Sequence, residues 1–281
     1  MAEVVLITGC SSGIGRTTAL YLANRDYTVY ATARKQEDLK SIVEDSKKIG
    51  KQIYGAQLDV NDVTTCRKVV SAIVKKEGKI DILINNAGFG QMGPLEDLTD
   101  KQIRDQMETN FFASVRMMQL VIPPMRNQRK GKIVNISSVG GRIAFPLASI
   151  YNASKFALEG LSESISGELK QFNIDVILIE PGYVKTRFAE TAEKKIEGMN
   201  TGKESPYHSM ITHWRNMYNK MEGNAGKPED VAEVIFKSIT DENPKLRYAG
   251  NANARQTLFL KKMLPESIFN NEVLRRAGVK K

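Results

Sequence analysis

The sequence has little histidine and cysteine and no long hydrophobic run, and each shortage excludes a class of protein. Its 281 residues include two histidines and two cysteines, too few for a disulfide framework and not spaced as metal ligands. No apolar run approaches the roughly 18 residues that cross a bilayer. The N-terminus passes from "MAE" into "VVLIT" without the features of a signal peptide. We therefore expect a cytoplasmic protein without a metal, in which Cys10 and Cys66 are reduced and buried.

Positive charge is in excess, and most of it lies near the C-terminus. The net charge is +9, and the segment from Lys245 to the end has nine Lys and Arg against Glu266 and Glu272. A solvated basic tail explains this excess, and so does a patch that contacts anionic lipid or nucleic acid. No nucleic-acid motif or interleaved aromatic stripe is present, so we predict no nucleic-acid partner. Membrane contact through residues 254–281, a basic C-terminal extension, stays open.

Short apolar runs alternate with longer amphipathic segments along most of the chain. The runs are "VVLIT", "YTVYAT", "QIYGAQL", "IDILIN", "GKIVNIS" and "IDVILIE". Such continuous apolar strands are typical of a parallel sheet with helices on both faces. We predict an α/β fold with a Rossmann-like, doubly wound parallel sheet. No linker composition interrupts the chain, so residues 1–281 are predicted to form a single domain.

Three longer helical patterns follow, at 97–125, from Ile150 and from Lys227. The segment 97–125 repeats apolar residues every three or four positions, and we expect its helix to end at Pro123 and Pro124. The segment "IYNASKFALEGLSESISGELKQF" keeps helical spacing and places Tyr151 and Lys155 at its start. A third helix opens at "KPEDVAEVIFKSI", where proline suits the first turn, and "KLRYAG" is predicted to be a last strand.

The first strand is followed by a glycine turn and a helix, in "VVLITGCSSGIGRTTALYLAN". Gly9 permits the tight turn, Gly13 lets the backbone approach a diphosphate, and Gly15 allows the helix to pack on the strand. The free N–H groups and the positive end of the helix then bind phosphates. The position after the first strand favours a dinucleotide site over an ordinary turn.

The glycine spacing T-G-x-x-x-G-x-G resembles the cofactor loop of the short-chain dehydrogenase/reductase family, and three further motifs follow in order. "NNAG" at 85–88 is similar to its sheet-stabilising motif, "YNASK" at 151–155 to its active-site motif, and "PGYVKT" at 181–186 to its nicotinamide-contacting turn. "TGCSSGIG", "VYATAR" and "NAGFGQMGPLED" look like the hydroxysteroid and retinol dehydrogenase branch. This resemblance implies a dinucleotide-binding catalytic domain and suggests a lipophilic alcohol or ketone as the substrate.

The residues after the second strand bear on the choice of cofactor. An acid there binds the ribose 2′-hydroxyl of NAD, whereas an arginine nearby accommodates a 2′-phosphate. Ala33 stands where the acid is expected, and Arg34 and Lys35 follow it. Ser12 could add a hydroxyl, and the alternative is that the two cations only begin a surface helix. We predict NADP(H).

The resemblance implies positions for the rest of the cofactor site. Asp59 and Val60 would flank the adenine, and Asn86, Ala87 and Gly88 would line the adenosine ribose. The full predicted set is Gly9, Ser11, Ser12, Gly13, Ile14, Gly15, Arg34, Lys35, Asp59, Val60, Asn86, Ala87, Gly88, Tyr151, Lys155, Pro181, Gly182, Val184 and Thr186.

Tyr151 and Lys155 lie four residues apart, and on a helix they would share a face with about 5 to 6 Å between their Cβ atoms. A free tyrosine has a pKa of about 10, too high for an effective base at neutral pH. A nearby ammonium would lower that pKa. Such a pair alone is most often an exposed pair, but the cofactor loop upstream favours a catalytic role.

The resemblance implies a role for each catalytic residue. Tyr151 would be the acid in reduction and the base in oxidation, Lys155 would also bind the nicotinamide ribose, and Ser138 would polarise the carbonyl, with Ser137 as its competitor. Asn110 would bend its helix and hold a water that relays protons, the alternative being a solvent-facing side chain. We predict an NADP(H)-dependent carbonyl reductase or alcohol dehydrogenase. The alternative is a regulatory protein that binds NADP(H) with little turnover, although such a protein would need none of these groups.

Residues 183–226 follow the cofactor turn and lack regular spacing, and we expect a substrate lid of short helices there. Aromatic and Met residues are scattered through it: Phe188, Met199, Tyr207, Met210, Trp214, Met217, Tyr218 and Met221. They either line an adaptable apolar pocket or fill a core between short helices. His208 and His213 are expected on the surface or in that pocket. The resemblance also implies a homo-oligomer built through the two long helices.

Overall fold

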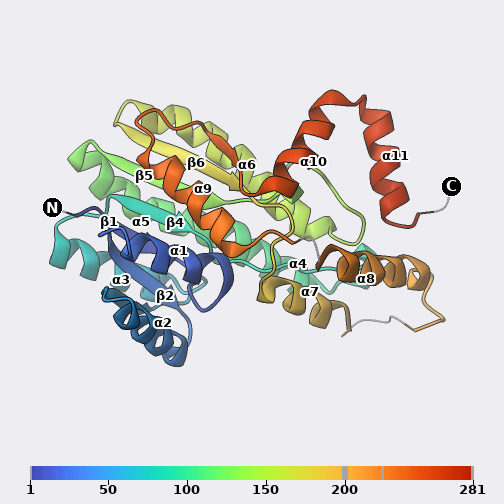
Figure 1. Ribbon diagram of the computed structural model, residues 1–281, viewed down its shortest axis with the longest axis horizontal. Coiled ribbons are helices and arrows are strands. Elements are labelled where there is room, and N and C mark those ends of the chain that lie inside the picture. Colours follow the sequence, from blue (N-terminus) through green and yellow to red (C-terminus); the bar gives the residue numbers. More distant parts are fainter. Residues whose placement is uncertain (1, 198–201, 223–224, 280–281) are drawn as a thin grey trace.

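A seven-stranded sheet in the order β3-β2-β1-β4-β5-β6-β7 forms the centre of the computed structural model, which describes residues 2–197, 202–222 and 225–279 (Figure 1). The strands are β1 (Val4–Ile7), β2 (Thr28–Ala33), β3 (Ile53–Gln57), β4 (Ile82–Asn85), β5 (Gly131–Ile136), β6 (Ile174–Glu180) and β7 (Arg247–Ala249). All six neighbouring pairs are parallel, which confirms the predicted fold. The strand order reverses at β1, and sheets of this kind bind ligands beyond the carboxyl ends of the strands at such a point.

Helices cover both faces of the sheet because alternate strand residues point to opposite sides. Val4 and Leu6 join a core with α3 and α5, whereas Val5 and Ile7 join a core with α1 and α9. The helices of the first half are α1 (Gly13–Ala23), α2 (Gln36–Lys48), α3 (Val63–Glu77), η1 (Leu95–Asp97), α4 (Asp100–Met107), η2 (Glu108–Phe112) and α5 (Ala113–Gln128). Those of the second half are η3 (Val139–Gly141), α6 (Ser149–Lys170), α7 (Arg187–Glu197), α8 (His208–Glu222), α9 (Pro228–Thr240), α10 (Ala252–Met263) and α11 (Glu266–Arg276).

The expected end of a helix at Pro123 and Pro124 is wrong, because α5 continues through both prolines to Gln128. Met125 follows them and is fully buried in the core beneath α5. A Cβ atom added at Gly131 would lie 2.6 Å from Met125 Sδ, so this side chain is tightly packed. We infer that burial of Met125 offsets the backbone hydrogen bonds that the prolines remove.

The expected short helices after β6 are confirmed as α7 and α8. Trp214 and Ile211 of α8 are buried with Met92 and Leu147 in a small core of their own. Phe188, Tyr207, Met210 and Met217 are partly buried against the same core. Core filling is therefore observed. Met199 and the side chains of Tyr218 and Met221 lie outside what the structure describes.

Helices α10 and α11 form a hairpin that projects at the same end of the molecule as α7 and α8 (Figure 1). No helix in the described part of the chain is long and apolar enough to cross a membrane. Cys10 and Cys66 are free and buried, as expected, and burial raises the pKa of the Cys10 thiol to about 12.

Candidate active site

The glycine turn after β1 is closely packed against other predicted site residues. Gly9 has φ +73°, and a Cβ atom added there would lie 2.8 Å from Ala87 Cα. Gly13 has φ +58°, and its added Cβ atom would lie 3.0 Å from Thr186 Cγ2. Only glycine adopts such a backbone conformation without strain. The turn is thus a cradle that side chains would fill, which fits the close approach of a diphosphate.

Gly15 lets α1 approach the residues that follow β1 and β4 closely. An added Cβ atom would lie 2.3 Å from Asn86 Nδ2 and 2.5 Å from the Gly9 carbonyl oxygen. Asn86 Nδ2 donates to the carbonyl oxygens of Thr8 and Gly9, at 2.9 and 3.0 Å. The Thr8 hydroxyl in turn accepts from the backbone N–H groups of Asn86 and Ala87, both at 3.0 Å. Gly15 therefore makes room for an amide that ties the glycine turn to the end of β4.

The first turn of α1 is open to an anion. Ser12 is the N-cap residue, and its side chain makes no capping hydrogen bond. The orphan N–H groups of a helix N-terminus and the Ser12 hydroxyl are therefore suited to bind a phosphate. Ser11 lies in the turn before it, and Ile14 lies within α1.

The cationic residues after β2 lie close to this turn along the sheet. Cys10 N donates to the Thr32 carbonyl oxygen at 2.7 Å, which joins the glycine turn to the end of β2. Arg34 and Lys35 follow directly and are exposed. Lys35 Nζ pairs with Glu37 at 3.1 Å, so Arg34 is the better placed of the two to meet a further anion.

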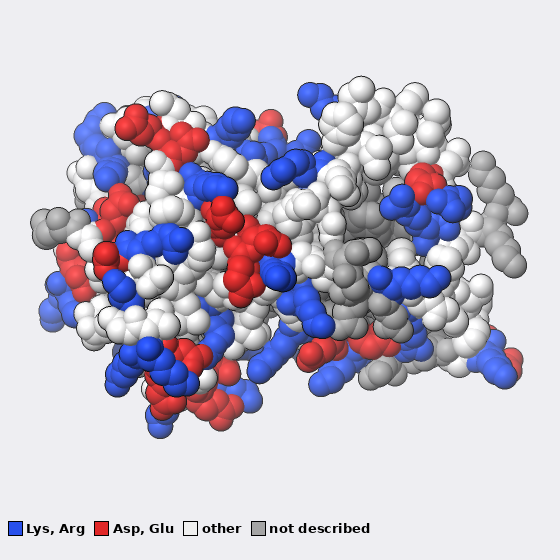
Figure 2. All heavy atoms as spheres, in the orientation of Figure 1, with Lys and Arg blue, Asp and Glu red and all other residues white. Residues whose placement is uncertain are grey.

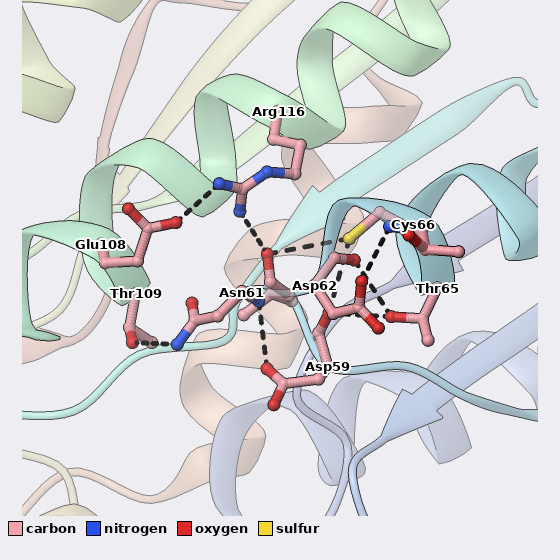
Figure 3. A network of polar contacts seen from close by, with 10 residues as sticks. Asp59, Asn61, Asp62, Thr65, Cys66, Glu108, Thr109 and Arg116 are labelled. Atoms are coloured by element: carbon pink, nitrogen blue, oxygen red, sulfur yellow. Dashed lines mark hydrogen bonds and ion pairs between the residues drawn. The ribbon is translucent and has the colours of Figure 1, made fainter.

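A polar network holds the loop after β3, which contains the two residues predicted beside the adenine (Figure 3). Arg116 of α5 donates to the Val60 carbonyl oxygen at 2.6 Å and pairs with Glu108 at 2.6 Å. Asp59 Oδ1 accepts from the backbone N–H of Asn61, in the same loop, at 3.0 Å. Because Glu108 belongs to the same helical turn as Asn110, the network connects the predicted adenine side of the site to its predicted proton-relay residue.

Asn110 is buried in a π-helical turn, so the solvent-facing alternative is wrong. Its side chain is only 1% exposed. Asn110 Oδ1 accepts from Phe89 N at 3.0 Å, and Nδ2 donates to the Phe89 carbonyl oxygen at 3.0 Å and to Ser154 Oγ at 3.2 Å. Ser154 Oγ donates to the Tyr151 carbonyl oxygen at 2.7 Å. Asn110 thus joins the π-helical turn to the beginning of α6, where Tyr151 lies.

The structure brings Ser138, rather than Ser137, to the phenol of Tyr151. A Cβ atom added at Gly140 would lie 3.0 Å from Tyr151 Cε1 and 3.4 Å from Ser138 Oγ, so both side chains flank this glycine. The Ser138 hydroxyl interacts with the phenol and opposes the rise in the pKa of Tyr151 that burial causes. Ser137 Oγ is buried on the side of Glu159, since an added Cβ atom at Gly141 would lie 2.8 Å from that oxygen and 3.0 Å from Glu159 Cγ.

Burial, rather than Lys155, dominates the pKa of Tyr151. The Phe188 ring of α7 lies over the phenol, with 5.5 Å between the ring centroids. Burial raises the pKa of Tyr151 to about 12, and the Ser138 hydroxyl opposes this rise. The expected lowering of this pKa by Lys155 is therefore wrong for this structure.

Lys155 does not lower the pKa of Tyr151 because its ammonium group is directed to the backbone. Lys155 is buried, and its Nζ donates to the Ile136 carbonyl oxygen at 2.8 Å. Burial lowers the pKa of Lys155 to about 8, and the negative charge of Glu159 one turn further along α6 opposes that shift. A lysine with this pKa gains and loses its proton near neutral pH.

The predicted nicotinamide turn lies between Ser138 and the glycine turn. Ser138 Oγ contacts the Pro181 carbonyl oxygen at 3.4 Å, and Thr186 meets Gly13 as described above. Val184 pairs with Gly226 in an isolated parallel bridge. The two ends of the segment 183–226 are therefore joined beside the site.

Asn251 is a buried residue of this region that the sequence reasoning missed. Its Oδ1 accepts from Gly182 N at 3.2 Å and from Ala254 N at 2.9 Å, and its Nδ2 donates to the Tyr183 carbonyl oxygen at 3.1 Å. One amide thus caps α10 and holds the turn that begins at Pro181. An asparagine directly before a helical pattern is an N-cap signal, which could have identified its local role but not its contact with the turn.

Replacing Asn251 with Ala is expected to loosen this turn. The change leaves the Gly182 N–H group without its partner, removes one hydrogen bond to the Tyr183 carbonyl oxygen, which still accepts from Gly226 N at 3.0 Å, and removes the cap of α10. Stability should therefore fall by about 2 to 3 kcal/mol. Urea denaturation measures this fall, and NADP(H) titration should show weaker binding. Asn271→Ala, on the exposed side of α11, is the control. Equal stability and affinity in the two variants would contradict the role.

The two histidines are not brought together with other metal-binding side chains. In the described ranges, no group of three or more His, Cys, Asp or Glu residues is placed to hold a metal ion. His213 Nε2 lies 2.9 Å from the Arg276 carbonyl oxygen, and His208 begins α8. His213 thus links α8 to α11.

Comparison with known sequences places these features in a family. Residues 3–197 match the family model described as short chain dehydrogenase. Over 245 residues the chain is 38% identical to 3-ketodihydrosphingosine reductase of Bacteroides thetaiotaomicron, covering 87% of this chain and 86% of that protein. Over 262 residues it is 39% identical to retinol dehydrogenase 8 of Homo sapiens, covering 89% of this chain and 81% of that protein.

Solved structures resemble the chain over almost its whole length. A short-chain dehydrogenase from Streptomyces avermitilis aligns with a TM-score of 0.80 at 30% identity, covering 99% of this chain and 97% of that one. A variant of actinorhodin polyketide ketoreductase with NADPH aligns with a TM-score of 0.75 at 29% identity, covering 89% and 96%. A Burkholderia phymatum protein with NAD aligns with a TM-score of 0.80 at 24% identity, covering 93% of each chain.

Proposed function

The chain belongs to the short-chain dehydrogenase family of oxidoreductases, and we propose that it interconverts a ketone or aldehyde and a lipophilic alcohol with NADP(H). One observation carries this proposal: the Tyr151 phenol and the Ser138 hydroxyl flank Gly140 at the carboxyl edge of the sheet. The glycine cradle after β1 lies at the same edge. A proton donor therefore lies beside a polar anchor for the substrate oxygen, close to a site suited to a dinucleotide.

The residues of the site divide the proton chemistry between them. A bound nicotinamide cofactor supplies the hydride for reduction and accepts it in oxidation. The Ser138 hydroxyl donates to the carbonyl oxygen of the substrate and polarises it. The Tyr151 phenol gives its proton to that oxygen in reduction and takes it back in oxidation. A pKa raised to about 12 keeps the phenol protonated at neutral pH, which supports a first role as the acid.

We propose that Lys155 and Asn110 supply and orient the groups behind the phenol. Lys155 would hold the nicotinamide ribose and, with a pKa lowered to about 8, exchange its proton with solvent near neutral pH. Asn110 would keep the helix bent and support the water that relays this proton. Its hydrogen bonds to Phe89 and Ser154 support the first of these roles, because they hold the π-helical turn against α6.

The preference for NADP(H) rests on the residues at the end of β2. Ala33 offers no carboxylate to a ribose 2′-hydroxyl, and Arg34 is exposed beside the glycine turn. An arginine can contact a 2′-phosphate with two parallel hydrogen bonds. The NADPH in the related ketoreductase structure supports the same choice.

Arg34→Ala is expected to weaken NADPH binding by about 10- to 100-fold, because charge-assisted hydrogen bonds contribute about 1.5 to 3 kcal/mol. NADH has no 2′-phosphate, so its affinity should stay unchanged. Fluorescence titration with both cofactors measures the difference. Lys40→Ala, an exposed cation on α2, is the control, and an equal loss for NADPH and NADH would contradict the assignment.

We further propose that residues 183–226 act as a lid over a lipophilic substrate. Phe188 of α7 lies over Tyr151, and a Cβ atom added at Gly90 would lie 2.6 Å from Phe188 Cζ. Met92 and Met210 belong to the same apolar cluster. Flexible Met and aromatic side chains can repack around a ligand. The relatives named for retinol and for 3-ketodihydrosphingosine also point to lipophilic substrates.

A panel of ketones, aldehydes and quinones separates the enzyme from the regulatory alternative. NADPH oxidation is followed for each compound, and NADPH affinity is measured in parallel. Turnover of lipophilic carbonyls above that of small polar ones supports the proposal. Tight cofactor binding without turnover of any compound would favour an NADP(H)-binding regulatory protein.

We also propose a cytoplasmic homo-oligomer in which residues 1–281 form one catalytic domain. Phe112 of η2 and Phe156 of α6 are both exposed, and the helices that bear them are the two expected to meet a second copy. Burial of these rings in a subunit contact would remove a large apolar area from water.

A further inference from the structure

Helix α10 exposes large apolar side chains on its outer face. Phe259 and Met263 are 60% and 62% exposed, and Ile268 at the start of α11 is 53% exposed. Single exposed apolar residues are ordinary in folded proteins, whereas a group of them marks an interaction site. Phe259 and Met263 lie four residues apart and therefore share one face of the helix.

Cations accompany these apolar side chains. Helical spacing places Arg255 and Lys262 beside Phe259 and Met263, and all four are exposed. No Asp or Glu occurs between Ala252 and Met263. The face therefore combines apolar side chains with positive charge, which is typical of helices that lie in the headgroup region of an anionic membrane.

Two neighbouring residues of the hairpin face the body of the protein and are therefore not part of its outer face. Lys261 Nζ donates to the Arg142 carbonyl oxygen, so this lysine is directed toward the body of the protein. Phe269 of α11 is buried. Residues other than Lys, Arg, Asp and Glu cover most of the visible surface of the projecting hairpin, and a cluster of acidic and basic residues lies over α11 (Figures 1 and 2).

A groove lies between α11 and the start of α6. It has a volume of about 650 Å³, and its walls include Phe145, Phe156 and Leu274. Asn152, the residue after Tyr151, also lines it. An apolar groove therefore lies between the hairpin and the helix that bears Tyr151.

We propose that the outer face of α10 docks on an anionic membrane surface. Phe259 and Met263 enter the boundary between headgroups and acyl chains, while Arg255 and Lys262 contact lipid phosphates. The occupant is a lipid surface because the face pairs apolar side chains with cations and has no acid. This inference goes beyond the proposed reaction, and its test does not measure activity.

Vesicle co-sedimentation of the full-length protein tests the docking. The protein should sediment with vesicles of phosphatidylcholine and phosphatidylglycerol but not with phosphatidylcholine alone, and salt should weaken binding. The double change Phe259→Ser and Met263→Ser should lower the partition coefficient by about tenfold or more. Lys262→Glu should lower it on the order of tenfold, because each surface cation contributes about fivefold.

Matched controls lie at the C-terminal end of α2, far from the hairpin in the sequence. Ile49→Ser removes a side chain that is 46% exposed, and Lys47→Glu makes the same charge change on an exposed lysine. Both should bind vesicles as the unaltered protein does. Absence of binding by the unaltered protein, or equal binding by the hairpin and α2 variants, would overturn the proposal. Sedimentation velocity supplies a further outcome: an oligomer without vesicle binding that the double serine change dissociates would make this face a subunit contact and would also overturn it.

Discussion

Tyr151→Phe is expected to lower kcat for carbonyl reduction by about 10³-fold, within the range of about 10² to 10⁴ that a positioned proton donor contributes. Phenylalanine keeps the ring against Phe188 and removes only the hydroxyl. Affinity for NADPH should change by less than about threefold, which corresponds to under 1 kcal/mol of binding free energy. Steady-state kinetics and cofactor titration measure the two effects separately.

The neighbouring serines supply a matched pair of controls for this prediction. Ser138→Ala should lower kcat/KM by about 10- to 100-fold, because it removes the hydrogen bond to the substrate oxygen. Ser137→Ala should retain activity, since that hydroxyl is buried on the side of Glu159. Retention of full activity by Tyr151→Phe, or equal losses in the two serine variants, would contradict the assigned roles.

The raised pKa of Tyr151 also predicts different pH profiles for the two directions. Reduction needs the protonated phenol, and with a pKa of about 12 that form dominates throughout the neutral range. Oxidation needs the phenolate. At pH values below the pKa, the phenolate fraction rises about tenfold for each unit by which the pH increases. Oxidation should thus accelerate with pH in the unaltered protein and lose this dependence in Tyr151→Phe.

Gly9→Ala is expected to cause a large loss of stability at the cofactor site. The left-handed conformation at φ +73° costs alanine about 1 to 2 kcal/mol. The added Cβ atom would also lie 2.8 Å from Ala87 Cα, an overlap that adds about 1 to 3 kcal/mol. The total loss is about 2 to 5 kcal/mol, and displacement of the turn should weaken cofactor binding by more than about tenfold.

Gly78→Ala is a matched control because it separates conformation from crowding. Gly78 has φ +76°, similar to Gly9, but nothing lies within 4 Å of an added Cβ atom there. It should cost only the conformational part, about 1 to 2 kcal/mol, and leave cofactor affinity unchanged. Urea denaturation and NADP(H) titration measure both variants. Equal losses at the two glycines would show that crowding at Gly9 has no effect.

Local patterns in the sequence were sufficient to predict the succession of strands and helices along the chain. Runs such as "VVLIT" and "IDVILIE" predict buried parallel strands, because both faces of such a strand are covered by helices. The glycine spacing predicts the turn after β1, since only glycine accepts the backbone conformation at Gly9 and Gly13. Each of these signals lies within a few residues of the structure that it predicts.

Features that depend on distant contacts were not predictable in this way. The helix continues past Pro123 because Met125 fills a buried position beside Gly131, and proline alone indicates an end. The role of Asn251 depends on Gly182, 69 residues earlier in the chain. The family resemblance favoured Ser138 over Ser137, but no local pattern could have done so, because the choice depends on which of two adjacent side chains meets α6 near Tyr151.

The sequence by itself determined the fold class, the family resemblance and the identities of the candidate proton-transfer residues, because apolar periodicity and motif spacing are sufficient to predict them. Only the tertiary structure decided the environment of those residues. It placed Phe188 over the phenol and Lys155 against the Ile136 carbonyl oxygen, which reversed the expected direction of the Tyr151 pKa shift. The physical reason is that desolvation depends on every neighbour that excludes water, and those neighbours come from segments far apart in the chain.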